Sequence, residues 1–185
     1  SFPEPTTLRQ VRGFVGLCNF FRAHVKNFAL LSAPLTRLTQ TSSGYEEGPL
    51  PEDARQSFQQ LKDILTTGPC LAFPRSDREY ALVTEAYPPE AGRRGLLAST
   101  LCQFDDQNQC HVLSYASRQL LDHESRYPAF LLEVAAANEG LDQFDQYLQG
   151  RPFVLFMDQR PREELSHLHK KTLARLADNM DRYSF

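Results

Sequence analysis

The spacing of apolar residues in this chain changes near residue 70, and that change limits the folds open to it. Before residue 70, apolar residues recur every three or four positions, which is the period of a helix packed on one side. After it come three short runs of strand-forming residues, at 79–84, 96–104 and 110–117, separated by turn signals. The sequence therefore predicts a helical front followed by a sheet.

A long helix and a fourth strand complete the second half. Helical spacing predicts a helix over roughly 125–149, ended by Gly150. The run "PFVLFMD" at 152–158 is apolar almost throughout, as a buried parallel strand should be. Helical spacing returns at 162–183. Three meandering strands, a crossover helix and a returning strand predict an α/β fold with one mixed sheet and flanking helices.

The helical front carries its own start signals. Thr7 and Gln10 stand at capping-box spacing ahead of an apolar stripe. Ser32 is expected to cap a second, short helix, with Pro34 tolerated in its first turn. A third helix is predicted over 51–68.

The boundary between the two parts is expected within 42–70. We divide the chain into a small all-α segment over 1–68 and an α/β domain over 69–185. A chain of 185 residues is long enough for one large domain with a smaller helical segment attached.

Charge is uneven along the chain. Residues 1–41 hold five basic residues against one acidic residue, a net charge of +4, and the rest holds 15 basic and 22 acidic residues, a net charge of −7. The basic front could contact phosphates, whereas the acidic remainder argues against a broad nucleic-acid footprint. An ordinary solvated surface accounts for the same charges.

Cysteine usage and hydropathy predict an intracellular, non-membrane segment. The four cysteines include no C-x-x-C pair, and no apolar run approaches the ~18 residues that a membrane span needs. No charged-then-apolar leader opens the chain, which begins at Ser1 without a methionine. We therefore expect a reduced compartment, no membrane contact, and a longer parent protein.

Four stretches, taken in chain order, resemble one family. They are "PEPTTLRQVRGFVGLCNFFRAHVKNFALLSAPLTRL" at 3–38, "DARQSFQQLKDILTTGPCLAFP" at 53–74, "SYASRQLLDHESRYPAFLLEVAAANEGLDQFDQYLQG" at 114–150 and "LARLADNMDRYSF" at 173–185. The first two are similar to the end of the reverse transcriptase, its thumb and connection, in gypsy-type LTR retrotransposons. The last two are similar to the ribonuclease H portion that follows. The closest likeness is to the vertebrate sushi class, from which mammals have domesticated several developmental, placenta-associated Gag-like proteins.

The resemblance implies a metal-dependent chemistry and its ligands. Ribonuclease H domains hold two divalent ions ~4 Å apart between carboxylates, and these ions activate water and stabilise the leaving oxygen. Glu85, after the first strand, Glu133, on the long helix, and Asp158, after the fourth strand, occupy three of the four acidic positions. These three are the candidate catalytic and metal-binding residues, with magnesium or manganese as the cofactor of an active enzyme. The fourth acidic position would lie beyond Phe185.

The chain departs from the family pattern around the first acidic position. Glu85 stands where the family has aspartate, which adds a methylene to a site that demands placement within about 0.5 Å. The stretch "YPPEAGRR" at 87–94 lengthens the following turn and brings Arg93 and Arg94, whose charge would compete with a metal ion. The resemblance with these departures implies lost or weak metal binding and weak or no binding of RNA–DNA hybrids.

Three functions therefore stay open. The first is a degenerate, catalytically inactive ribonuclease H-like domain that binds a protein partner or a second copy of itself and needs no cofactor. The second is an active ribonuclease H that cleaves RNA in RNA–DNA hybrids. The third is a nucleic-acid-binding remnant that uses the basic front. Outside any metal site, Glu133 could be solvated or paired with an arginine, and Asp158 could cap the helix that follows it.

Overall fold

The computed structural model describes residues 2–68, 71–91, 94–158, 180 and 182–184. The chain divides into two compact units, Ser1–Cys70 and Leu71–Phe185, which are considered separately below. Among the described residues, no helix has both the length and the apolar character that crossing a bilayer requires. The predicted helix over 162–183 lies almost wholly outside the described residues.

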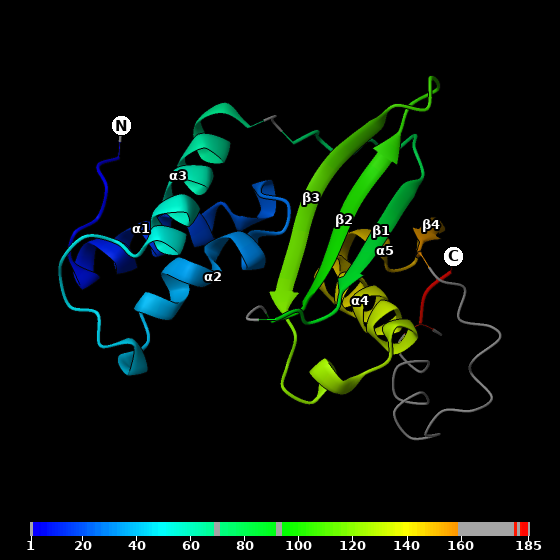
Figure 1. The fold of residues 1–185 in the computed structure, drawn as a ribbon. Helices are drawn as coiled ribbons and strands as arrows, with labels where there is room; N and C mark the ends of the chain where they lie inside the picture. The colour runs from blue at the N-terminus through cyan, green and yellow to red at the C-terminus, as the bar shows by residue number, and fades with distance from the viewer. Residues whose placement is uncertain (1, 69–70, 92–93, 159–179, 181, 185) are drawn as a thin grey trace. The chain divides into compact units, whose positions relative to one another are not determined.

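The first unit is helical, as its apolar spacing predicts (Figure 1). Its elements in chain order are α1 (Leu8–Phe20), η1 (Arg22–His24), α2 (Phe28–Leu38), η2 (Thr41–Ser43) and α3 (Glu52–Thr67). The capping box at the start of α1 is confirmed, because the Thr7 hydroxyl accepts the Gln10 amide and the Gln10 side chain accepts the Thr7 amide. The rings of Phe14 and Phe58 meet at 4.6 Å between centroids in the core of this unit.

The predicted start of α2 is wrong. The helix begins after Asn27, which has a left-handed φ of 55°, so Ser32 lies buried inside the helix and does not cap it. Pro34 is therefore mid-helix, where it lacks the amide that would bond to the carbonyl of Leu30. Burial of Phe28 in the core extends the helix toward its N-terminus, so that it begins earlier than the proline alone would predict.

The second unit is built on one mixed sheet of four strands, in the order β3-β2-β1-β4. The strands are β1 (Tyr80–Tyr87), β2 (Leu96–Phe104), β3 (Cys110–Gln119) and β4 (Phe153–Phe156). β1 pairs antiparallel with β2 and parallel with β4, and β2 pairs antiparallel with β3. The prediction of a central first strand flanked by the second and fourth strands is confirmed.

One long helix connects β3 to β4 and covers the sheet. Figure 1 shows α4 (Ala129–Gln143) lying across the sheet, and its side chains share a core with those of β1 and β2. Gly140 permits this close approach, since a Cβ there would lie 3.0 Å from the Cβ of Ser99. The predicted helix over 125–149 is in fact three pieces, η3 (Glu124–Arg126), α4 and α5 (Asp145–Leu148). Pro128 starts α4, and Phe144, which lies outside helical geometry, ends it.

The fourth strand is parallel to β1, as predicted, but it is less buried than its apolar run predicts. Phe153 is 2% exposed, but Val154 and Phe156 are 40% and 46% exposed. β4 is an edge strand within the described part of the chain, and the helical core covers only the face that carries Phe153. An apolar run does not distinguish a strand covered on both faces from one covered on a single face.

A half-buried arginine, Arg118, joins β3 to the connection that leads into α4. The Arg118 guanidinium donates two hydrogen bonds to the Glu124 carboxylate, at 2.6 and 2.8 Å, and one to Glu139 of α4, at 2.6 Å. Glu124 also accepts the Leu121 amide at 2.7 Å. The hydrogen bonds from Arg118 hold the pKa of Glu124 below its ordinary value, although Glu124 is only 6% exposed. The "SYASR" stretch thus fixes the crossover helix against the sheet.

We expect Arg118→Met to lower the free energy of unfolding of the second unit by about 2 to 3 kcal/mol, because it leaves the buried Glu124 carboxylate without a cation. The expected loss of unfolding free energy is smaller than the usual loss on breaking a fully buried ion pair, because the Arg118 side chain is 30% exposed. Urea unfolding, with hydrogen exchange of the α4 amides as the readout for this unit, measures the change.

Arg75→Met is the matched control. Its ion pair with Asp77 is exposed on both sides, so its loss should leave stability unchanged within error. Equal effects of the two substitutions would show that the Arg118 contacts do not hold the crossover in place.

Candidate functional site

The three candidate residues come from three separate elements and line one pocket. Glu85 lies on β1, Glu133 on α4, and Asp158 two residues beyond the end of β4. The pocket has a volume of about 420 Å³. Its lining consists of Val83, Thr84, Glu85, Ala86, Tyr87, Glu133, Phe156, Met157 and Asp158. The structure therefore brings together the acidic positions that the resemblance picked out, and their role as metal ligands stays a prediction.

The pocket exists because the two pairings of β1 have different lengths. β1 pairs with β2 as far as Tyr87, opposite Leu96, but with β4 only as far as Val83, opposite Phe156. The Thr84 hydroxyl donates to the Phe156 carbonyl at 3.3 Å, just where the parallel pairing stops. Beyond that point β1 runs on without β4 beside it, and the pocket opens there.

Glu133 is the buried member of the set. Glu133 is 7% exposed. The Ala86 amide donates to its carboxylate, and its Oε2 atom has no hydrogen-bond partner. Burial raises its pKa above the ordinary value, and the charges of Asp158 and Glu85 raise it further. The alternative of a solvated Glu133 is therefore wrong.

Glu85 is held by a neighbour that the sequence analysis did not single out. The Tyr87 hydroxyl donates to Glu85 Oε2 at 2.9 Å. Side chains two apart on a strand share a face, so Glu85 and Tyr87 lie together, whereas Ala86 packs toward α4. Glu85 also lies inside β1, opposite Ala98, and not at the strand end as predicted. Its spacing from Tyr87 was the sequence signal for this contact.

The lengthened turn places its described arginine away from the pocket. Arg94 forms an ion pair with Asp122 at 3.2 Å and is not among the residues that line the pocket. Gly95 closes the turn tightly, since a Cβ there would lie 2.5 Å from the Tyr87 carbonyl oxygen and 2.5 Å from Leu120. Competition between Arg94 and a metal ion stays a prediction. Arg93 lies outside the described residues.

The carboxylates fit a divalent pair poorly as they stand. Among the residues that the structure describes, no three His, Cys, Asp or Glu side chains are grouped so that they could hold one metal ion. One oxygen of Glu85 accepts the Tyr87 phenol proton, and burial raises the pKa of Glu133. Magnesium requires near-octahedral oxygen ligands at about 2.1 Å, which the described side chains do not supply as a group of three. The predicted cap at Asp158 concerns a helix outside the described residues.

A protein-family comparison matches this part of the chain. The model of the family described as "RNase H-like domain found in reverse transcriptase" matches residues 50–155. The chain belongs to this family. The RNase H-like domain has relatives at about 30% identity in Pol polyproteins, and two come from Drosophila melanogaster. The Pol polyprotein of transposon 297 is 29% identical over 91% of this chain, and that of transposon opus is 31% identical over 86%.

Retroviral proteins match as well. The Gag-Pol polyprotein of gibbon ape leukemia virus is 33% identical over 80% of this chain. The chain spans only 15%, 16% and 8% of the lengths of these three relatives. A foamy viral protease-reverse transcriptase solved with RNA/DNA hybrid has a TM-score of 0.74, with 16% identity, over 98% of this chain and 24% of that one. At that identity the likeness shows the fold.

We expect Glu133→Gln to stabilise the RNase H-like domain at neutral pH. A raised folded-state pKa means that the neutral acid is favoured in the folded state, so Glu133 contributes stability below its ordinary pKa of 4.5. That contribution is lost as pH rises through the raised value. The amide stays neutral, so the advantage of the variant should appear as pH rises above 4.5 and grow toward pH 7.

Thermal unfolding of both proteins between pH 4 and pH 8 provides the measurement. The matched control is Glu79→Gln, an exposed acid just before the other end of β1, which should show no such pH-dependent gain. A Glu133→Gln variant that is less stable than wild type at pH 7 would mean that a favourable partner holds the Glu133 charge.

Proposed function

We propose that this chain contains a catalytically silent RNase H-like domain that serves as a folded interaction module in a protein derived from a retrotransposon. The observation that carries the proposal is the state of the pocket. The three acidic positions line it together, yet no three acidic side chains group as a metal site among the described residues. Such an arrangement preserves the fold of a nuclease without the ligand geometry that two-metal hydrolysis requires.

Two further features support the loss of activity. Tyr87 donates to the Glu85 oxygen that a metal ion would need, which adds a competitor at the first acidic position. Burial raises the pKa of Glu133, which works against the ionised carboxylate that a metal ion binds. Each feature acts on a different carboxylate, so restoring one residue alone would not restore the site.

The proposed setting is a host protein that has taken over an element of the sushi class, with a developmental role that includes the placenta. This part rests on the sequence resemblance and on the departure at Glu85. A protein partner or self-association would be the function of the retained fold, in an intracellular location and without a cofactor. The chain spans a small fraction of its relatives, so the activity of the whole protein belongs to this proposal.

An active ribonuclease H is the second candidate, and one observation favours it. The described lining of the pocket contains three acidic side chains, Glu85, Glu133 and Asp158. A divalent ion would be attracted to such a pocket and could draw the carboxylates together. In that case the protein would cleave RNA in hybrids.

A cleavage assay separates the two. We expect a protein extended past Phe185, so that the fourth acidic position is included, to leave a labelled RNA–DNA hybrid intact in magnesium or manganese, and its Glu85→Asp variant to remain inactive because Tyr87 and Glu133 are unchanged. Glu133→Gln controls for contaminating nuclease, since a contaminant would cut equally in both preparations. Metal-dependent cleavage by the unmodified chain that Glu133→Gln abolishes would establish the active enzyme instead.

A further inference from the structure

The outer face of α1 carries large apolar side chains where a surface helix ordinarily carries polar ones. Val11, Phe14 and Cys18 of this helix pack into the core of the helical unit. Outside that core, Phe20 is 81% exposed and Leu17 is 43% exposed. A helix that is apolar on more than one face is ordinarily covered on more than one face. The outer face of α1 therefore has the composition of a contact surface.

Two exposed glycines lie on the same side of the helix as Phe20. Gly13 and Gly16 precede Phe20 by seven and four residues, and residues at these spacings share one face of a helix. Glycine is less favourable than alanine inside a helix, yet a Cβ at either position would meet nothing within 4 Å. Packing within the chain thus requires neither glycine. Bare backbone beside an exposed ring does allow a second helix to approach closely.

The charge along this face is positive. Arg9 stands on the same side of α1, and Arg22 follows the helix in η1; both are exposed, and neither forms an ion pair with another described residue. The helix α1 contains no acidic residue, and residues 1–41 carry a net charge of +4. Glu46 meets α1 at the end opposite Phe20, through a backbone hydrogen bond. A partner that complements this face is therefore both apolar and acidic.

We propose that the outer face of α1 binds an acidic amphipathic helix of a partner protein. The apolar side chains of that helix pack on Leu17 and Phe20, and its carboxylates face Arg9. A short acidic helix fits better than a nucleic acid, because residues 42–185 carry a net charge of −7 and would repel a phosphate backbone that runs past α1. The inference concerns the helical unit and goes beyond the proposed function of the RNase H-like domain, so either can fail alone.

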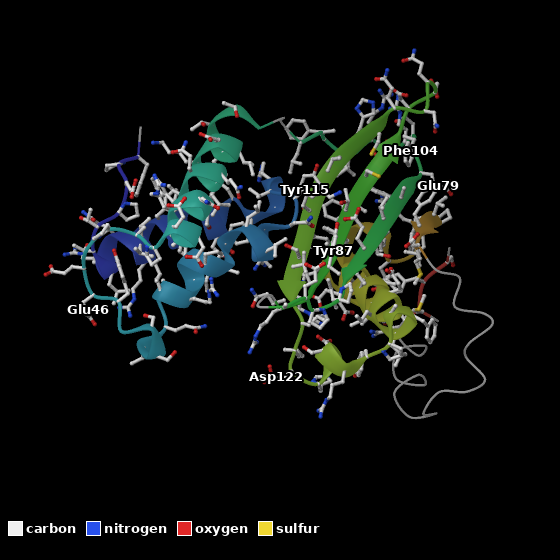
Figure 2. The ribbon with its side chains drawn as sticks, viewed as in Figure 1. Glu46, Glu79, Tyr87, Phe104, Tyr115 and Asp122 are labelled. Carbon is white, nitrogen blue, oxygen red and sulfur yellow. The ribbon has the colours of Figure 1, made fainter. Side chains whose placement is uncertain are left out.

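A peptide titration of the isotope-labelled chain tests this directly. The probe is acetyl-Glu-Leu-Ala-Glu-Glu-Leu-Ala-Glu-Leu-Glu-Ala-Glu-Leu-Glu-amide, whose leucines share one helix face, and the control peptide replaces every glutamate with lysine. We expect the acidic peptide to shift the backbone amide signals of Gly13, Gly16 and Phe20, with a dissociation constant on the order of 0.1 mM for so small an interface. The lysine peptide should shift none of them. The amides of Phe104 and Tyr115, which Figure 2 shows on β2 and β3, should stay in place with both peptides.

Three variants locate the binding. Phe20→Ala removes the most exposed ring of α1 and should weaken the binding of the acidic peptide about tenfold or more. Phe73→Ala is the matched control, because Phe73 is an equally exposed ring outside α1, and it should leave the titration unchanged. Gly16→Ala should raise the melting temperature, since alanine favours the helix and its Cβ meets nothing in the chain. The same Cβ should weaken peptide binding severalfold by keeping the two helices apart, an effect that a purely structural glycine would not show.

Several outcomes would overturn the inference. The first is that the acidic peptide leaves the α1 signals in place, and the second is that the lysine peptide binds equally well. Equal weakening by Phe20→Ala and Phe73→Ala would place the peptide elsewhere on the chain. An RNA–DNA hybrid that displaces the peptide from the same signals would make a nucleic acid the ligand of α1. A Gly16 signal that moves with protein concentration alone would mean that a second copy of the chain covers the face. None of these outcomes bears on hybrid cleavage, which tests the RNase H-like domain by itself.

Discussion

The second unit depends on the unequal pairing of β1. Eight residues of this strand pair with β2, but only four pair with β4. A parallel neighbour such as β4 cannot follow by a tight turn, so the chain must cross the sheet through α4 before it returns. The shortness of the return strand then leaves the end of β1 open on one side. The strand order, the position of the helix and the pocket are consequences of that one arrangement.

The pocket combines features that cost stability. A carboxylate is buried on α4, two more lie near it, and the described lining contributes no positive charge. Elsewhere in the same unit, the buried acid Glu124 is paired with a cation, because the Arg118 guanidinium forms ion pairs with both Glu124 and Glu139. Among the described residues, the ion pairs of Arg118 thus distinguish Glu124 from Glu133, whose Oε2 atom has no hydrogen-bond partner.

Much of the fold followed from local rules. Strand order and the crossover could be predicted because turn residues and a change of apolar period mark each boundary. The start of α2 and the exposure of β4 could not, because they depend on tertiary burial of Phe28 and on which faces of a strand are covered. At the site, it was the family resemblance that predicted Glu85, Glu133 and Asp158 as members of one site. The two-residue spacing of Glu85 and Tyr87 places them on one face of β1, but it does not specify the hydrogen bond between them, and no local pattern indicates the ion pair of Arg94 with Asp122.

The contacts that hold the crossover differ greatly in sequence separation, so they differ in the chain entropy that is lost when each one forms. Arg118 reaches Glu124 and Glu139 across 6 and 21 residues, whereas Tyr80 of β1 pairs with Phe153 of β4 much farther along the chain. Closing the longer loop costs about 1 kcal/mol more in chain entropy than closing the loop to Glu139, and about 2 kcal/mol more than closing the loop to Glu124. The Arg118 contacts can therefore form before β4 docks on β1, so the crossover does not need the fourth strand to be held in place.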